Sequence, residues 1–162
     1  MKTAYLALGS NLGDREANLR DAVRRLDADD LRITRRSSLY ETAPRELLDQ
    51  PWFLNAAVEI ETSLFPLQLL ARVRAIERAM GRRREVPKGP RNIDIDILFY
   101  ARAIIATTEL KVPHPRLGKR RFVLEPLEEI APDFRDPVTG KTAQEMLAAL
   151  EPQGVRRLAI GL

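Results

Sequence analysis

The chain has 162 residues, of which 44% are hydrophobic and 31% charged, and it contains no cysteine. These values are typical of a globular protein, and the absence of cysteine excludes disulfide bonds and thiolate chemistry. No apolar run is long enough for a membrane span, and the N-terminal apolar stretch is too short for a secretory signal. The net charge of +4 is too small to indicate nucleic-acid binding. We expect one cytoplasmic domain covering residues 1–162.

The first hundred residues predict four strands and two helices in the order β-α-β-β-α-β. Turn residues bound the four strands, which are expected over residues 2–9, 32–41, 53–62 and 93–99. Apolar residues recur at helical spacing in the two helices, over residues 15–27 and 66–80. Asp14 is the expected N-cap of the first helix, and Gly81 ends the second. This order predicts an α+β, ferredoxin-like sandwich in which helices cover one face of an antiparallel sheet.

Beyond residue 100 the expected elements are shorter. The segment 102–115 predicts one or two short strands, residues 120–132 predict a short helix that ends at Pro132, and residues 142–150 predict another helix. The tail over residues 154–162 is either a late strand or a loose end.

Asp94 and Asp96 stand in "NIDIDIL", the most strand-prone segment of the chain. Because strand side chains alternate, both carboxylates and Asn92 are expected on one face, with three isoleucines packed against helices on the other. Carboxylates at this spacing, with Cα atoms roughly 6.5–7 Å apart, suit Mg²⁺ together with substrate phosphates. The alternative is a solvated outer face whose charges discourage pairing at a sheet edge.

Basic residues flank the carboxylate strand on both sides. They are Arg82, Arg83, Arg84, Lys88 and Arg91 before it, and His114, Arg116, Lys119, Arg120 and Arg121 after it. Guanidinium groups bind phosphate oxygens bidentately, so acids that hold Mg²⁺ inside such a ring suit triphosphate transfer. Taken alone, the basic run at residues 82–84 favours a solvated face or an RNA contact over triphosphate binding. No Walker A motif is present.

Six motifs, in order, resemble those of the 6-hydroxymethyl-7,8-dihydropterin pyrophosphokinases of folate biosynthesis. They are "ALGSNLGD", "YETAP", "QPWFLNAAV", "IERAMGR", "GPRNIDIDIL" and "VPHPRLGKRRFVLEPL", and the resemblance covers residues 3 to about 150. It implies a ferredoxin-like fold and transfer of pyrophosphate from ATP to the hydroxymethyl oxygen of the pterin, giving AMP. Small molecules are the implied partners, with no nucleic acid and no membrane, and we expect a monomer because no large apolar surface stripe is evident.

The resemblance also implies site residues. Two Mg²⁺ ions would be held by Asp94 and Asp96, which join Arg82 and Arg91 as the catalytic set. The residues expected to bind the triphosphate of ATP are Arg84, Arg91, His114 and Arg120. The pterin would lie between two aromatic rings with its edge read by an amide; these residues are Phe53, Phe122 and Asn55, with groups around Thr42 and Pro44. The general base stays open between Asp96, bulk water and the metal.

The sequence departs from the family pattern without losing a metal or phosphate ligand. Residues 82–91 are about one residue shorter than in relatives, Lys88 stands where an aromatic residue is frequent, and Phe53 stands where tyrosine is frequent. We expect an active enzyme, and the sequence leaves open whether its affinity for ATP is altered. Two other hypotheses are an RNA-binding module, in which the strand carboxylates would repel phosphate, and an inactive relative serving as an interaction domain, against which the intact acidic and basic residues argue.

Overall fold

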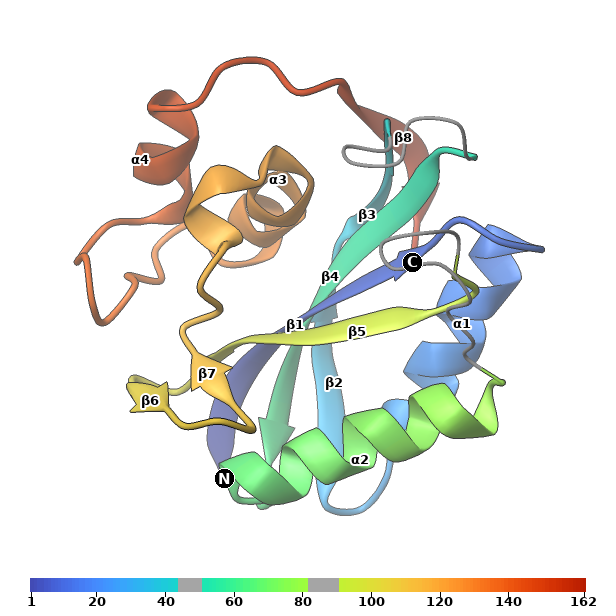
Figure 1. The fold of residues 1–162 in the computed structure, drawn as a ribbon, viewed down its shortest axis with the longest axis vertical. Coiled ribbons are helices and arrows are strands. Elements are labelled where there is room, and N and C mark those ends of the chain that lie inside the picture. Colours follow the sequence, from blue (N-terminus) through green and yellow to red (C-terminus); the bar gives the residue numbers. More distant parts are fainter. Residues whose placement is uncertain (44–50, 82–90) are drawn as a thin grey trace.

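The computed structural model describes residues 1–43, 51–81 and 91–162, and an antiparallel sheet forms its centre (Figure 1). The strand order is β5-β1-β4-β3-β8, and β2 also pairs with β4. The strands are β1 Lys2–Ser10, β2 Leu31–Arg36, β3 Ser38–Thr42, β4 Phe53–Thr62, β5 Asp94–Tyr100 and β8 Val155–Gly161. Every pairing between them is antiparallel. This arrangement confirms the predicted ferredoxin-like class.

The two helices predicted in the first half pack on one face of the sheet (Figure 1). They are α1 Arg15–Leu26 and α2 Pro66–Ala79. The side chain of Asp14 accepts a hydrogen bond from the Ala17 amide, which confirms it as the N-cap of α1. Gly81 follows α2 with a φ of +73°, a conformation that favours glycine after a helix. The core between these helices and the sheet includes Leu6, Leu8, Leu19, Val23, Leu69 and Val73.

The two helices predicted in the last third of the chain cover the opposite face, a position that the sequence did not predict (Figure 1). They are α3 Arg121–Ile130 and α4 Ala143–Ala148, preceded by the 3-10 helix η1 Leu117–Lys119 and the short pair β6 Ile105–Ala106 and β7 Lys111–Val112. A bulge in β5 adds Phe99 to the second core. Leu6 pairs with Ile97 and Tyr5 with Phe99, so Leu98 is an extra residue, and Leu98 and Phe99 both join the α3–α4 core.

The single strand predicted over residues 32–41 is two strands, β2 and β3, divided at Ser37. The hydroxyl of Ser37 accepts a hydrogen bond from the Ala57 amide, while the Ser37 amide donates to the Ala57 carbonyl. A side-chain atom therefore replaces a backbone acceptor at this point, and the pairing register with β4 shifts across it. A hydrophobic pattern does not indicate such a break, because the break is set by a contact between Ser37 and the neighbouring strand β4.

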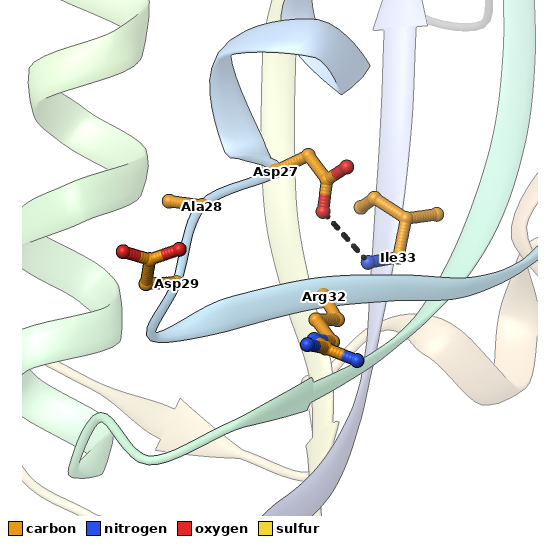
Figure 2. A pocket seen from close by; sticks show the side chains of 5 residues that line it. All are labelled: Asp27, Ala28, Asp29, Arg32 and Ile33. Carbon is orange, nitrogen blue, oxygen red and sulfur yellow. Dashed lines mark hydrogen bonds between the residues drawn. The ribbon is translucent and has the colours of Figure 1, made fainter.

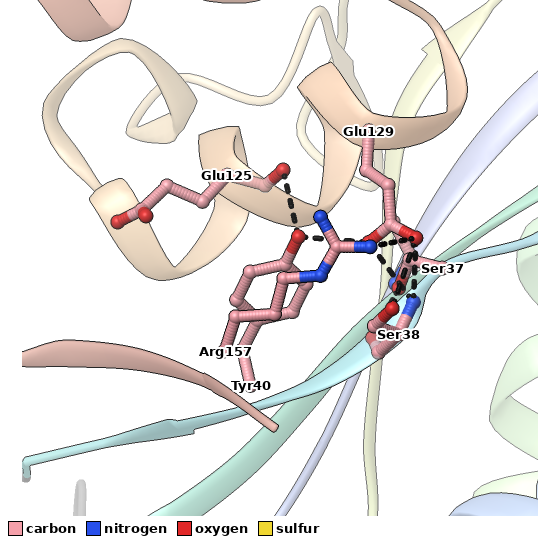
Figure 3. Close-up of polar contacts among 7 residues, drawn as sticks. Ser37, Ser38, Tyr40, Glu125, Glu129 and Arg157 are labelled. Carbon is pink, nitrogen blue, oxygen red and sulfur yellow. Dashed lines mark hydrogen bonds and ion pairs between the residues drawn. The ribbon is translucent and has the colours of Figure 1, made fainter. Parts of the chain in front are cut away.

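The C-terminal tail forms β8, which pairs with β3 and resolves the choice left open for it. A polar cluster ties this edge to α3 (Figure 3). Its centre is Glu129, which accepts hydrogen bonds from the amide and hydroxyl of Ser38 and from the hydroxyl of Tyr40 at 2.8 Å. Arg157 on β8 lies 3.2 Å from the same carboxylate. Strands β3 and β8 are thereby fixed to the helix that covers them.

Within the described ranges no helix combines the length and apolarity needed to cross a bilayer.

Candidate active site

The two aspartates of β5 lie on the face of the sheet opposite α1 and α2. Ile95 and Ile97 belong to the core beneath those helices, as does Ile93, whereas Asp94 and Asp96 alternate with them on the other side. The predicted alternation is therefore confirmed for both carboxylates. It was wrong for Asn92, which precedes the strand and donates a hydrogen bond to the Met80 carbonyl at the end of α2.

A row of paired residues brings distant parts of the sequence together on this face. Tyr40 pairs with Asn55, Asn55 with Gly9, and Gly9 with Asp94, so the row crosses β3, β4, β1 and β5. Residues directly opposite on neighbouring strands share a face. An atom placed at the Cβ position of Gly9 would lie 2.9 Å from Oδ1 of Asn55. The Asn55 amide thus occupies space that a side chain at position 9 would fill.

Asp96 lies in an environment that disfavours its charge. Burial, the Asp94 carboxylate and the Glu77 carboxylate raise the pKa of Asp96 to about 7, while Arg120 and Arg91 act in the lowering direction. The raised pKa means that Arg91 and Arg120 do not fully offset the cost of a negative charge at Asp96. A cation beside Asp94 and Asp96 would relieve the repulsion, so the electrostatics fit a divalent metal.

Arg91 connects the carboxylates to the aromatic side of the site. Its Nε lies 3.4 Å from Oδ2 of Asp94, and its guanidinium carbon lies 4.8 Å from the ring centre of Phe53. The backbone of Arg91 is held by Asn11, whose Oδ1 accepts from the Arg91 amide at 2.8 Å. Asn11 also donates from Nδ2 to the Pro51 carbonyl, just before Phe53. The residues just before Phe53 and the segment before Asp94 are therefore fixed to each other.

His114 and Arg120 approach the carboxylates from the segment after β7. The amide of His114 donates to the Leu98 carbonyl of β5 at 3.0 Å, which places this residue beside the carboxylate strand. Burial, followed by the charges of Arg120 and Arg116, lowers the pKa of His114, against the opposing effect of Asp94. The lowered pKa favours the neutral imidazole of His114 near pH 7.

The residues predicted to hold a flat heterocycle occupy the same face. Nδ2 of Asn55 donates to Oγ1 of Thr42 at 2.8 Å, and both side chains are buried. Phe53 is half-buried at the start of β4, and Phe122 is half-buried in the first turn of α3, with the guanidinium of Arg120 5.4 Å from its ring centre. The structure thus brings an amide and two rings to the side of the sheet that carries the carboxylates.

Three of the predicted site residues, Pro44, Arg82 and Arg84, lie outside the described residues, as does Lys88. A separate open pocket of about 440 Å³ lies at the turn between α1 and β2 (Figure 2). It is lined by Asp27, Ala28, Asp29, Arg32 and Ile33. No residue predicted for the site lines this pocket, and it has no part in the chemistry considered below.

Several residues that shape the site were missed by sequence reasoning. Glu77 on α2 accepts a hydrogen bond from the amide of Ile95, the residue between the two aspartates, at 2.9 Å. Arg15 at the start of α1 donates to the Trp52 carbonyl and to Glu41. These contacts join residues 18 to 37 positions apart, so no local pattern announces them. Glu77 stands in the motif "IERAMGR", whereas Arg15 lies just after "ALGSNLGD" and outside every motif.

The described residues contain no group of three or more His, Cys, Asp or Glu side chains arranged to hold a metal ion. Two carboxylates on one strand face are nevertheless sufficient for Mg²⁺, which usually binds one or two carboxylates and completes its shell with water and substrate phosphates. The donor set therefore fits a metal that is shared with a polyanionic substrate.

Fold and site together define the class of protein: a ferredoxin-like sheet that carries an acidic pair among cationic groups on the face opposite α1 and α2, as phosphate transfer requires. The family model for 7,8-dihydro-6-hydroxymethylpterin-pyrophosphokinase (HPPK) matches residues 5–132. The chain belongs to this family.

Relatives of known name cover nearly all of the chain. It is 48% identical over 159 residues to 2-amino-4-hydroxy-6-hydroxymethyldihydropteridine pyrophosphokinase from Methylorubrum extorquens, with 98% of this chain and 99% of the relative covered. It is 50% identical over 144 residues to the enzyme of the same name from Bacillus subtilis, with 88% and 86% covered.

A solved structure has the same fold. The crystal structure of wild-type Plasmodium falciparum HPPK-DHPS with pteroate matches 91% of this chain with a TM-score of 0.73 and 19% identity. This chain spans 42% of that protein's length. At this identity the match bears on the fold alone.

Proposed function

We propose that this chain transfers pyrophosphate from ATP to the hydroxymethyl oxygen of 6-hydroxymethyl-7,8-dihydropterin, with Asp94 and Asp96 at the centre of the site. Family membership makes the chain an ATP-dependent pyrophosphokinase of folate biosynthesis. The observation that carries the site assignment is the acidic pair itself, in which Asp96 has a pKa raised to about 7 by burial and its acidic neighbours. Such a pair is suited to a cation brought in with the substrate.

The cationic residues bind the triphosphate. Arg91 and Arg120 act on Asp96 electrostatically, and His114 lies next to β5. Guanidinium forks neutralise charge on the equatorial oxygens as the pyrophosphoryl group is transferred. Arg82 and Arg84 belong to the same set by their positions in the family motif, with Arg82 acting on the transferring group.

Two Mg²⁺ ions, held by Asp94 and Asp96, would supply Lewis-acid stabilisation of the transferring group and lower the pKa of the attacking hydroxyl. The protein's own contribution is to present both carboxylates on one rigid strand, whose amide at Ile95 is fixed by Glu77. This fixed placement matters because alignment of the hydroxyl with the β-phosphorus supplies much of the rate.

The pterin is bound by the amide and the two rings. Asn55 offers both a donor and an acceptor to the pterin edge, and its orientation is set by Thr42 and by the space above Gly9. Phe53 and Phe122 stack on the faces of the heterocycle, and groups around Pro44 complete the pocket. In the same proposal, residues 1–162 form one domain that acts as a cytoplasmic monomer without nucleic-acid or membrane partners.

The test is a coupled assay for AMP with ATP and Mg²⁺, in the presence and absence of the hydroxymethyl-dihydropterin. We expect AMP to form only when the pterin is present, and Asp96→Ala to abolish it while the circular dichroism spectrum stays that of the wild type. A matched control is Asp133→Ala, an exposed aspartate after α3 that should leave the rate unchanged. AMP formation without pterin, or full activity in Asp96→Ala, would refute the assignment.

A further inference from the structure

Arg121 separates two residues of the site but is itself directed away from it. Arg120 and Phe122, which flank it, are assigned to nucleotide and pterin, and the present inference rests on that proposed function. Arg121 belongs to the same basic run in the sequence, yet its side chain contacts the segment between α4 and β8. Arg121, the residue between the two proposed ligand-binding side chains, is therefore fixed by contacts on the side away from the site.

The guanidinium of Arg121 caps the C-terminal end of α4. Its Nε donates to the Glu151 carbonyl at 2.9 Å, and its Nη2 donates to the carbonyls of Leu150 at 3.0 Å and Leu147 at 3.3 Å. The last carbonyls of a helix have no partner within the helix, and a cation is favoured at that end. The contact thus satisfies α4 while fixing Arg121.

Gln153, from the segment after α4, caps the N-terminal end of α3. Its Oε1 accepts from the Arg121 amide at 3.0 Å, and its Nε2 donates to the Lys119 carbonyl at 3.1 Å. The N-cap residue of α3, Arg120, makes no capping hydrogen bond with its own side chain. The acceptor that a helix N-terminus requires is therefore supplied from 32 residues away.

The same segment also reaches the other wall of the site. The carbonyl of Gly154 accepts a hydrogen bond from the Ala43 amide, directly after Thr42 at the end of β3. Strand β8 then continues along β3, where Arg157 lies 3.2 Å from Glu129 (Figure 3). Residues 147–154 consequently connect the start of α3 to the end of β3 and are anchored beyond it.

We propose that residues 147–154 are a positioning clamp for Arg120 and Phe122, with Gln153 and Arg121 as its positioning residues. The clamp fixes the backbone on both sides of Arg120 and the side chain of Arg121, and so sets where the Arg120 guanidinium and the Phe122 ring stand relative to Thr42. It lies beyond residue 132, where the match to the family model ends. A segment outside the shared motifs thus controls the geometry of residues within them.

Gln153→Met tests the clamp, because it keeps the size of the side chain and removes both hydrogen bonds. We expect amide hydrogen exchange at residues 121–123 to accelerate about tenfold, and kcat/KM to fall by about tenfold as Arg120 and Phe122 lose their fixed placement. The melting temperature should change by only a few degrees. Arg121→Lys should behave similarly, because it keeps the positive charge but loses the planar fork.

Gln144→Met is the matched control, since Gln144 is an exposed glutamine on α4. It should leave exchange, melting temperature and turnover as in the wild type. The combination of Gln153→Met with Arg120→Ala separates positioning from general destabilisation. If Gln153 acts through Arg120, the double variant should lose less activity than the product of the two separate losses.

The outcomes are distinguishable from those of the proposed function. Hydrogen exchange needs no substrate, so unchanged exchange at residues 121–123 in Gln153→Met would overturn the clamp whatever the reaction. Losses that multiply fully in the double variant would overturn it as well. Absence of pterin-dependent AMP in the wild type would instead refute the proposed function.

Discussion

At Asp96, burial and the charges of Asp94 and Glu77 all raise the pKa, to about 7 from the ordinary value of 3.8. The folded protein therefore binds a proton at this carboxyl over a pH range in which the unfolded chain has already lost it. Stability from this group is fully present below the unfolded pKa of 3.8. It is lost as the pH rises towards the folded value.

Asp96→Asn removes this loss, because the amide carries no charge at any pH. In EDTA, the free energy of unfolding of the variant should exceed that of the wild type by an amount that grows from about pH 4 to pH 7 and then stays constant. Urea unfolding at a series of pH values measures it, with Asp133→Asn as the exposed control. A difference that does not change with pH would contradict the assignment.

Gly9 gives a second prediction at the level of a single residue. In Gly9→Ala the new methyl group would lie 2.9 Å from Oδ1 of Asn55, so the Asn55 amide must move. We expect KM for the pterin to rise about tenfold, the effect of disturbing one hydrogen-bonded edge, with little change in KM for ATP. Steady-state kinetics with each substrate varied in turn measures both values.

The control for Gly9→Ala is Gly161→Ala, because nothing lies within 4 Å of a Cβ at Gly161. It should match the wild type in both constants. Equal losses for pterin and ATP in Gly9→Ala would show a general disturbance of the sheet rather than a displaced Asn55.

Strand β3, strand β8 and helix α3 meet at Glu129, and we expect this contact to contribute to the stability of the protein. Glu129→Ala leaves the Tyr40 hydroxyl and the Ser38 amide without their acceptor, at a cost of about 1–3 kcal/mol in the free energy of unfolding. Arg157→Ala removes only an ion pair whose arginine side chain is 59% exposed, at a cost below about 1 kcal/mol. Urea unfolding compares the two, and a larger loss in Arg157→Ala would contradict this ranking.

The elements that the sequence predicted best are those fixed by local patterns. Helices α1 and α2 and strand β4 follow from apolar spacing with a cap or a proline at the start. The division at Ser37 and the bulge at Leu98 did not follow, because each is set by a contact with a neighbouring strand. The two C-terminal helices were predicted, but their position over the second face was not, because it depends on contacts between distant elements: the bulge turns Phe99 to the side on which Leu98 already lies.

Across the whole molecule, the charged residues of the site were predictable because two aspartates are unusual in a strand and the basic runs flank them. The supporting residues were not. Gly9 contributes an absence of side chain, and Gln153 and Glu77 contribute hydrogen bonds to residues distant in the sequence. Such contributions exist only once strand register and helix packing are known.

The row from Tyr40 through Asn55 and Gly9 to Asp94 runs across four strands that come from separate stretches of the chain. The acidic pair, the space at Gly9 and the Asn55 amide therefore lie on different strands, and slippage of any one by a single position would turn its contribution to the wrong side. We therefore expect enzymatic activity to be recovered in a single step during refolding, when the last of these strands pairs with its neighbour.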